Sequence, residues 1–218
     1  MTRALIMAGG DDEKWTRLGG AGRRHFAPVL GEPLLHRTLR QIRSHGITDI
    51  GIIAPDLPEY ALKGTYRIEP TTREWGHEAL NAIDHWSGTC RTIQVFGDTV
   101  FSNLAMAIIC GYRPRRFQAF GYHRGKSGEL FAFSFWPEHR EMWERAVRLG
   151  FELKERGIIK RAGSWEGYRI VAGARGPMVA QHRLYPRYFT NIRDGTDDTD
   201  TPAKLAKMLK IAKTRRWK

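Results

Sequence analysis

The sequence predicts one α/β domain with a mixed, mostly parallel central sheet. Short apolar segments alternate with amphipathic helical segments through the first half of the chain, a pattern typical of parallel strands joined by crossover helices. Two aromatic-rich β segments separated by a glycine-rich break follow in the second half, and they make the sheet mixed. A length of 218 residues suits a single domain, and we find no internal repeat or low-complexity linker.

The chain opens with strand, loop, helix and strand. Residues 4–10 form a short apolar strand ending in a glycine pair, and residues 11–24 form a polar, glycine-rich loop. Residues 31–46 carry leucines at helical spacing and stop at a glycine, so we expect a helix there. Residues 49–55 are the second strand, and this order predicts a right-handed parallel crossover.

The remaining elements continue this alternation. We expect helices at residues 77–86, 105–112, 138–156 and 202–217, and strands at 92–98, 116–123, 128–136 and within 182–192. Residues 163–176 are polar and glycine-rich with little regular pattern. Ligands in open α/β sheets bind beyond the carboxyl ends of the strands, so the loops after Met7, Ala54 and Phe96 are the places to look for chemistry.

The charge is the unusual feature of the composition. Thirty-six Lys and Arg against 23 Asp and Glu give a net charge of +13, which favours nucleic acid, nucleotides or an anionic membrane as partners. A plain arginine-rich enzyme is the alternative. No apolar run is long enough to span a bilayer, so we expect a cytoplasmic protein that does not enter a membrane. Cys90 and Cys110 are expected to be reduced core thiols.

The first chemical motif is the glycine turn Ala8, Gly9, Gly10 with the basic residues that follow it. Glycines let backbone N–H groups approach an anion closely, and cationic side chains neutralise phosphate charge. A simple turn is the alternative reading. The candidate nucleotide-binding residues are Ala8, Gly9, Gly10, Lys14, Arg17 and Arg24.

Acidic residues at two distant places form the second motif. Asp98 follows Gly97 at the end of an apolar strand, and a carboxylate facing phosphates there needs a divalent cation between them. Four aspartates crowd into residues 194–200, where they require a cation or water. The alternatives are a turn at Asp98 and helix capping by Asp200 or Thr201.

Three weaker signals remain. Trp75 and Gly76 stand where a helix begins, and Glu129 opens an aromatic strand; a core tryptophan and an exposed strand end explain them equally well. Basic residues recur near residue 113 and along the last helix, where Lys204, Lys207 and Lys210 share one face. The nucleic-acid-binding candidates are Arg113, Arg115, Arg116, Lys207, Lys210, Arg215 and Arg216.

These motifs together resemble the nucleotide-diphospho-sugar transferase superfamily, whose nucleotidyltransferases carry roughly LAGGxGxRx, then PKxLxxxxGxPxL. The resemblance covers the first 55 residues well. It implies a three-layer, Rossmann-like GT-A or nucleotidyltransferase fold, with a nucleotide-binding half at 1–110, an acceptor-side half at 111–200 and a basic C-terminal helix at 201–218. Lys14 stands at the signature arginine and Arg24 at its lysine, and Pro28, Gly31, Pro33 and Leu34 fall in step.

The resemblance also implies roles. Asp98 and, by its D-T-P step, Asp200 would hold Mg²⁺ or Mn²⁺ on the diphosphate, while Trp75 and Gly76 would shape the nucleobase pocket. Asp198 and Glu129 are candidate general bases. Arg24 would neutralise charge on the leaving group.

The AGG turn, GEPLLHRT, GELFAFSF and the late aspartates are most similar to phage DNA-hypermodifying glycosyltransferases within this superfamily. They predict a metal-dependent enzyme that moves a sugar from a nucleotide-sugar donor to a hydroxymethylated base in DNA, acting as a monomer or weak dimer. One alternative is a nucleotidyltransferase that joins an NTP and a sugar phosphate and releases pyrophosphate, against which Arg24 in place of lysine counts. The other is an inactive relative that binds nucleic acid.

Overall fold

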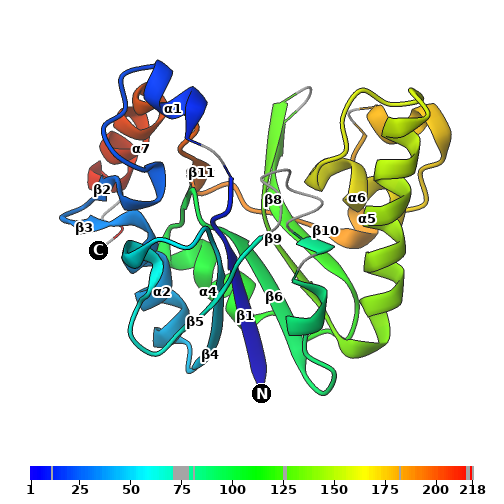
Figure 1. Ribbon diagram of the computed structural model, residues 1–218, viewed down its shortest axis with the longest axis horizontal. Helices are drawn as coiled ribbons and strands as arrows, with labels where there is room; N and C mark the ends of the chain where they lie inside the picture. Colours follow the sequence, from blue (N-terminus) through cyan, green and yellow to red (C-terminus); the bar gives the residue numbers. More distant parts are fainter. Residues whose placement is uncertain are drawn as a thin grey trace.

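A seven-stranded mixed sheet forms the centre of the molecule (Figure 1). The computed structural model describes residues 1–10, 12–70, 79–80, 82–124, 127–181, 183–214 and 217. The strand order is β10-β8-β9-β6-β1-β4-β5, which confirms the predicted mixed α/β architecture. None of the described helices combines the length and apolar character needed to cross a bilayer.

Most strands of this sheet run in one direction. β1 pairs in parallel with β4 and β6, β4 with β5, and β8 with β10, whereas β9 is antiparallel to both β6 and β8. The bounds are β1 Thr2–Met7, β4 Asp49–Ile53, β5 Tyr66–Ile68, β6 Arg91–Phe96, β8 Gln118–Arg124, β9 Ser127–Phe135 and β10 Phe189–Asn191. The carboxyl ends of β1, β4 and β6 therefore meet at one edge of the sheet.

Helices cover both faces of the sheet and make three layers. On one face, α2 (Leu34–Ser44) and α4 (Asn103–Gly111) bury their apolar sides against alternate residues of β1, β4 and β6. On the other face, α5 (Arg140–Glu155) and α6 (Ser164–Val171) pack with the opposite residues of the same sheet. Both faces are apolar because parallel strands buried on two sides cannot alternate with polar residues.

A third, smaller core joins the two ends of the chain. Trp15 of α1 (Glu13–Arg17), Val29 of β2 (Pro28–Val29) and Leu205 of α7 (Pro202–Thr214) pack together, and Trp217 closes this core. The buried Arg37 donates from Nη2 to the carbonyl oxygen of Trp217 at 2.5 Å. This end of the chain is thereby attached to α2.

Two further short strand pairs complete the fold. β2 pairs with β3 (Glu32–Pro33), and β7 (Thr99–Val100) pairs with β11 (Asp197–Asp198), both antiparallel. Single 3₁₀ turns lie at Arg24–Phe26, Pro58–Tyr60, Ile83–His85, Pro137–His139, Gly176–Ala180 and Pro186–Tyr188.

Several predicted elements are confirmed, and three predictions were wrong. The helices at 31–46, 105–112, 138–156 and 202–217, the strands at 92–98, 116–123 and 128–136, and the late strand within 182–192 are present. Cys90 and Cys110 are buried and free, as expected. Residues 11–24 contain α1, residues 163–176 contain α6, and β5 was missed. Most of the predicted helix 77–86 lies outside the described residues; Ala79 and Leu80 are helical, and Ile83–His85 form a 3₁₀ turn.

The missed helix α6 has a physical explanation. Gly167, which looked like a loop residue, lies where α6 crosses α5: a Cβ there would sit 3.1 Å from the Trp143 ring. The helix begins where the backbone N–H of Gly163 donates to the Glu166 carboxylate at 3.0 Å. The glycine allows the two helices to approach closely. Helix propensity alone counts a glycine against a helix, so α6 was missed.

The pairing of β8 with β9 requires a glycine at position 121. A Cβ on Gly121 would lie 2.1 Å from the carbonyl oxygen of Glu129, so Gly121→Ala must separate the two strands at the bulge between Phe120 and Gly121. We expect a loss of about 1–3 kcal/mol or more in the free energy of unfolding, measured by urea denaturation. Gly111→Ala is the matched control, because a Cβ there meets nothing within 4 Å. Equal stabilities of the two variants would contradict this account.

Candidate functional site

The glycine turn and Asp98 lie side by side at the carboxyl ends of β1 and β6. The N–H of Gly97 donates to the carbonyl of Met7 at 2.8 Å, so the segment after β6 stays paired with β1 one residue beyond the end of β6. A Cβ on Gly97 would lie 2.9 Å from that carbonyl oxygen and 3.1 Å from the Ala8 Cβ. Glycine at position 97 therefore lets Asp98 leave β6 directly beside the turn at residues 8–10.

The late acidic segment is held against Asp98 by backbone pairing. β11 pairs with β7 in the register Asp198 opposite Thr99. Thr199 then donates twice, from its N–H and from its Oγ1, to the carbonyl oxygen of Asp98, each at 2.8 Å. Residues about one hundred positions apart are fixed next to each other by this contact.

Four ionisable side chains meet at this point, and we call Lys14, Arg24, Asp98 and Asp200 the charged cluster. Arg24 lies between the two acids, with Nη2 3.5 Å from Asp98 Oδ2 and Nη1 3.8 Å from Asp200 Oδ1. Lys14 Nζ donates to Asp200 Oδ2 at 2.6 Å. Two cations and two carboxylates alternate in space, so the cluster is electrically balanced.

The glycine turn leaves room for Arg24. A Cβ on Gly10 would lie 2.6 Å from Arg24 Nη2, so any side chain at position 10 would displace the guanidinium. Asp12 holds the backbone of Arg24, since its carboxylate accepts from the Arg24 N–H at 3.2 Å. Arg23 Nη1 also donates to Asp12, at 3.2 Å. Asp12 thus orders the basic loop around the cluster.

The carboxylates of this region repel one another. Burial raises the pKa of Asp98 above its ordinary value; the Arg24 guanidinium opposes this rise and the Asp200 carboxylate adds to it. Burial likewise raises the pKa of Glu129, with Lys204 opposing and with Asp197, Asp200 and Asp98 adding to the rise. Neighbouring carboxylates whose charged forms disfavour one another attract any added cation.

This donor set fits a divalent cation shared with a ligand. In the described parts of the chain, no three Asp, Glu, His or Cys side chains are grouped so as to hold a metal ion. Mg²⁺ usually takes one or two carboxylates and completes its shell with water and phosphate oxygens. Asp98 and Asp200 face the same guanidinium, and the charge of Asp200 adds to the rise in the pKa of Asp98, which suits two carboxylate ligands of a metal on bound phosphates.

The other predicted site residues are distributed around the cluster. Ala8 and Gly9 are buried in the turn, and Arg17 is exposed in the last turn of α1. Asp198 makes an ion pair with Lys204 of α7, and Glu129 lies opposite Tyr122 across the β8–β9 pair. Trp75 and Gly76 lie outside the described residues.

The predicted nucleic-acid-binding residues do not form one track. Arg113 lines a small cavity with Met1 and Thr2 at the amino-terminal edge of the sheet, opposite the charged cluster. Nearby, Arg115 stacks over Trp136 and Arg116 donates to the hydroxyl of Tyr112. Lys207 and Lys210 instead lie on α7, while Arg215 and Arg216 are outside the described part of the chain.

Sequence reasoning missed His25, a buried residue that follows Arg24 and lies against Gly97. Its side chain is fully buried, its Nδ1 lies 2.9 Å from the Tyr60 hydroxyl, and its Cδ2 lies 3.4 Å from where a Cβ of Gly97 would be. Burial, with Arg24 and Arg23 adding to the effect, lowers the pKa of His25 to about 3. A histidine directly after two arginines gave no signal of burial.

Solved structures resemble this chain, although no family model and no curated protein matches it. A protein from Bacillus anthracis, described as a glucose-1-phosphate thymidylyltransferase in complex with sucrose, has a TM-score of 0.64 at 13% identity, covering 97% of this chain and 95% of that one. The CTP:phosphocholine cytidylyltransferase of Streptococcus pneumoniae has a TM-score of 0.63 at 14% identity, covering 96% and 98%.

A nucleotidyl transferase from Methanothermobacter thermautotroptrophicus has a TM-score of 0.51 at 14% identity, covering 66% of this chain and 76% of that one. All three of these proteins are named as nucleotidyltransferases. At such identities the likeness shows the fold, and it confirms the predicted nucleotidyltransferase-like, Rossmann-like architecture. None of the three is named as an enzyme that modifies DNA.

The Arg24–Asp98 contact predicts a change in titration. Removing the guanidinium in Arg24→Ala removes a cation that favours the charged carboxylate, so the pKa of Asp98 should rise further. A ¹³C NMR titration of the aspartate carboxyl carbons measures it. Arg23→Ala is the matched control, since Arg23 pairs with Asp12 and Glu59. A fall in the Asp98 pKa in Arg24→Ala would contradict the geometry.

The buried His25 predicts acid sensitivity. Because its pKa is about 3 when folded and about 6.5 when unfolded, only the unfolded chain takes up this proton between those values. The contribution of His25 to stability is present above pH 6.5 and falls by about 1.4 kcal/mol per pH unit down to about pH 3.

His25→Asn retains a nitrogen near the Tyr60 hydroxyl and should flatten the acid limb of a stability–pH profile, measured by urea denaturation. His45→Asn serves as the control, because His45 is exposed at the end of α2. Identical acid limbs in wild type and His25→Asn would refute the prediction.

Proposed function

We propose that this protein is a metal-dependent nucleotidyltransferase that joins a nucleotide to a phosphorylated acceptor and releases pyrophosphate. The charged cluster carries this proposal: two carboxylates and two cations meet beside a glycine turn, at the strand ends where α/β folds bind ligands. The likeness to nucleotidyltransferases over nearly the whole chain supports nucleotide transfer over the sugar transfer expected from the sequence.

The proposed reaction is an exchange at phosphorus. A phosphate oxygen of the acceptor bonds to the α-phosphorus of an NTP, the bond from that phosphorus to the bridging oxygen breaks, and pyrophosphate leaves with the electron pair. Arg24 and Lys14 stabilise the charge that develops on the leaving group. Asp98 and Asp200 would hold Mg²⁺ or Mn²⁺, which would supply Lewis-acid stabilisation of phosphate charge.

The free protein holds its cations and carboxylates against each other. With an NTP bound, Arg24 and Lys14 would pair with its phosphates, and Asp98 and Asp200 would be released to hold a divalent cation. Arg24 has a planar fork that reaches two acceptors at once, which a lysine at this position does not have.

A second candidate is transfer of a sugar from a nucleotide-sugar to a hydroxymethylated base in DNA. The net charge of +13 favours it, since such a field attracts nucleic acid. Separation of the basic groups onto opposite edges of the sheet weighs against a continuous DNA track. In this reaction the nucleoside diphosphate is the leaving group, and no pyrophosphate is released.

Pyrophosphate release distinguishes the two candidates. The protein is incubated with each NTP and a panel of sugar 1-phosphates and phosphocholine, with Mg²⁺ or with EDTA, and pyrophosphate is measured by a coupled assay. We expect release that needs both substrates and disappears in EDTA. Labelled sugar moving from a nucleotide-sugar to hydroxymethylated duplex, without pyrophosphate, would replace this proposal by the second candidate.

Asp98→Asn tests the metal assignment. Loss of one metal carboxylate should lower kcat by at least about 100-fold, because metal stabilisation of phosphate charge is worth several kcal/mol. Asp56→Asn is the matched control, since Asp56 is 72% exposed in an ion pair with Arg67. Normal turnover by Asp98→Asn would overturn the assignment of Asp98 as a ligand.

A further inference from the structure

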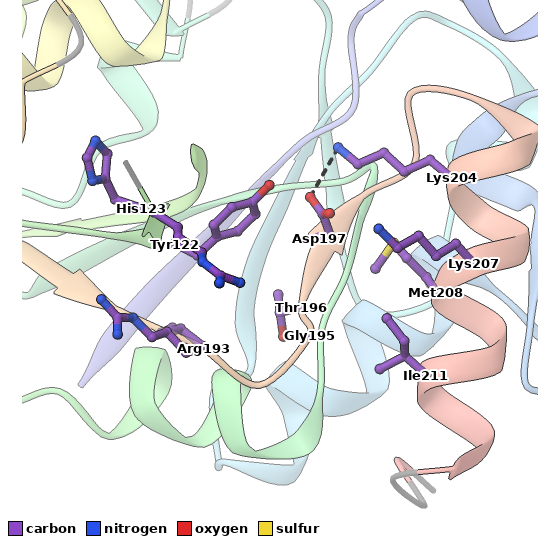
Figure 2. A pocket seen from close by; sticks show the side chains of 12 residues that line it. Tyr122, His123, Arg193, Gly195, Thr196, Asp197, Lys204, Lys207, Met208 and Ile211 are labelled. Atoms are coloured by element: carbon purple, nitrogen blue, oxygen red, sulfur yellow. Dashed lines mark ion pairs between the residues drawn. The ribbon is translucent and has the colours of Figure 1, made fainter. Parts of the chain in front are cut away.

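A cavity of about 600 Å³ lies beside the candidate site, between the end of β8, residues 192–197 and the inner face of α7 (Figure 2). Its volume is that of a small-molecule site. One part of the wall is apolar and consists of Ile192, Met208 and Ile211. Tyr122 adds an aromatic ring. Such a wall takes the organic part of a ligand.

The rest of the wall is strongly cationic. Arg124, Arg193, Lys204 and Lys207 line the cavity, against a single carboxylate, Asp197. That carboxylate already forms an ion pair with Lys204, whose Nζ lies 3.1 Å from Asp197 Oδ1. In the described portion of the chain, neither Arg193 nor Lys207 has a carboxylate within 4.0 Å. The cavity therefore carries uncompensated positive charge.

Lys204 connects this cavity with the charged cluster. Figure 2 shows Lys204 extending from α7 over Asp197, with Lys207 one turn further along pointing into the cavity. Lys204 also pairs with Asp198. Its positive charge opposes the rise that burial causes in the pKa of Asp98 and in that of Glu129. Asp197 of β11 lines the cavity, and Asp200 of the charged cluster follows three residues later in the chain.

We propose that this cavity is a second anion site, which binds a phosphate-bearing small molecule such as a nucleoside or sugar phosphate. Lysine and arginine side chains on one side match a phosphate, and the apolar side chains opposite match a ring or chain. The ligand would compete with Asp197 and Asp198 for Lys204. This site goes beyond the proposed reaction and does not depend on it.

Direct binding tests the proposal without turnover. Isothermal titration in EDTA uses uridine monophosphate, glucose 1-phosphate and a short DNA duplex as probes, in a Lys14→Ala/Arg24→Ala background that removes the cations of the charged cluster. We expect at least one small phosphate to bind in this background. Adding Arg193→Gln/Lys207→Gln should weaken it at least tenfold.

The matched control is Arg156→Gln/Lys210→Gln, which removes the same charge from exposed positions outside the cavity. It should change binding less than twofold, and circular dichroism checks that every variant is folded. The proposal is overturned if no small phosphate binds in the background, if both double variants weaken binding equally, or if only the duplex binds. None of these outcomes bears on pyrophosphate release, so the two proposals fail separately.

Discussion

The antiparallel pairing of β11 with β7 is the contact on which the whole candidate site depends. It is a short ladder, Asp198 opposite Thr99, extended by two hydrogen bonds from Thr199 to the Asp98 carbonyl. Without it, Asp200 would not be held beside Asp98, and Arg24 would lose one of its acidic neighbours. Backbone hydrogen bonds fix the position of the Asp200 segment beside Asp98 more precisely than flexible ion pairs do. An exposed ion pair loses much of its energy to side-chain entropy and water.

The charges around this contact favour a bound ligand over the free state. Asp98 is buried enough for its pKa to be raised, and Asp200 adds to that rise. Arg24 opposes this rise only in part. The distances between cations and carboxylates in the charged cluster run from 2.6 Å (Lys14 to Asp200) to 3.8 Å (Arg24 to Asp200). A cation between the acids and phosphates on the basic side chains would satisfy all four groups of the charged cluster at once.

Much of the fold could be predicted from the sequence because its strands and long helices carry strong periodic signals. α2 and α5 show regular apolar spacing, and the strand ends at Gly10 and Gly97 carry glycines. α1 and α6 were missed for physical reasons: α1 buries Trp15 alone among polar residues, and α6 contains a glycine that packs on Trp143. A one-residue anchor or a close helix crossing leaves no periodicity to find.

All four residues of the charged cluster were named as candidates from the sequence, but their pairing in space was not predicted. Asp98 could be found because it ends a strand, and Asp200 because it precedes Thr-Pro. The contact of Lys14 with Asp200 joins residues 186 positions apart, and no local pattern encodes such a pair. His25 and Asp12 were not identified from the sequence, since each acts through a neighbour that only the folded chain provides.

The third core has a consequence for how the protein is made. Trp15, in the basic loop after the glycine turn, packs with Leu205, Met208 and Trp217, which are synthesised after every strand of the central sheet. The central sheet needs none of these residues, because its strands end at Asn191. A nascent chain can therefore complete its sheet while the basic loop still lacks its support, and the loop acquires its final shape only when α7 emerges from the exit tunnel.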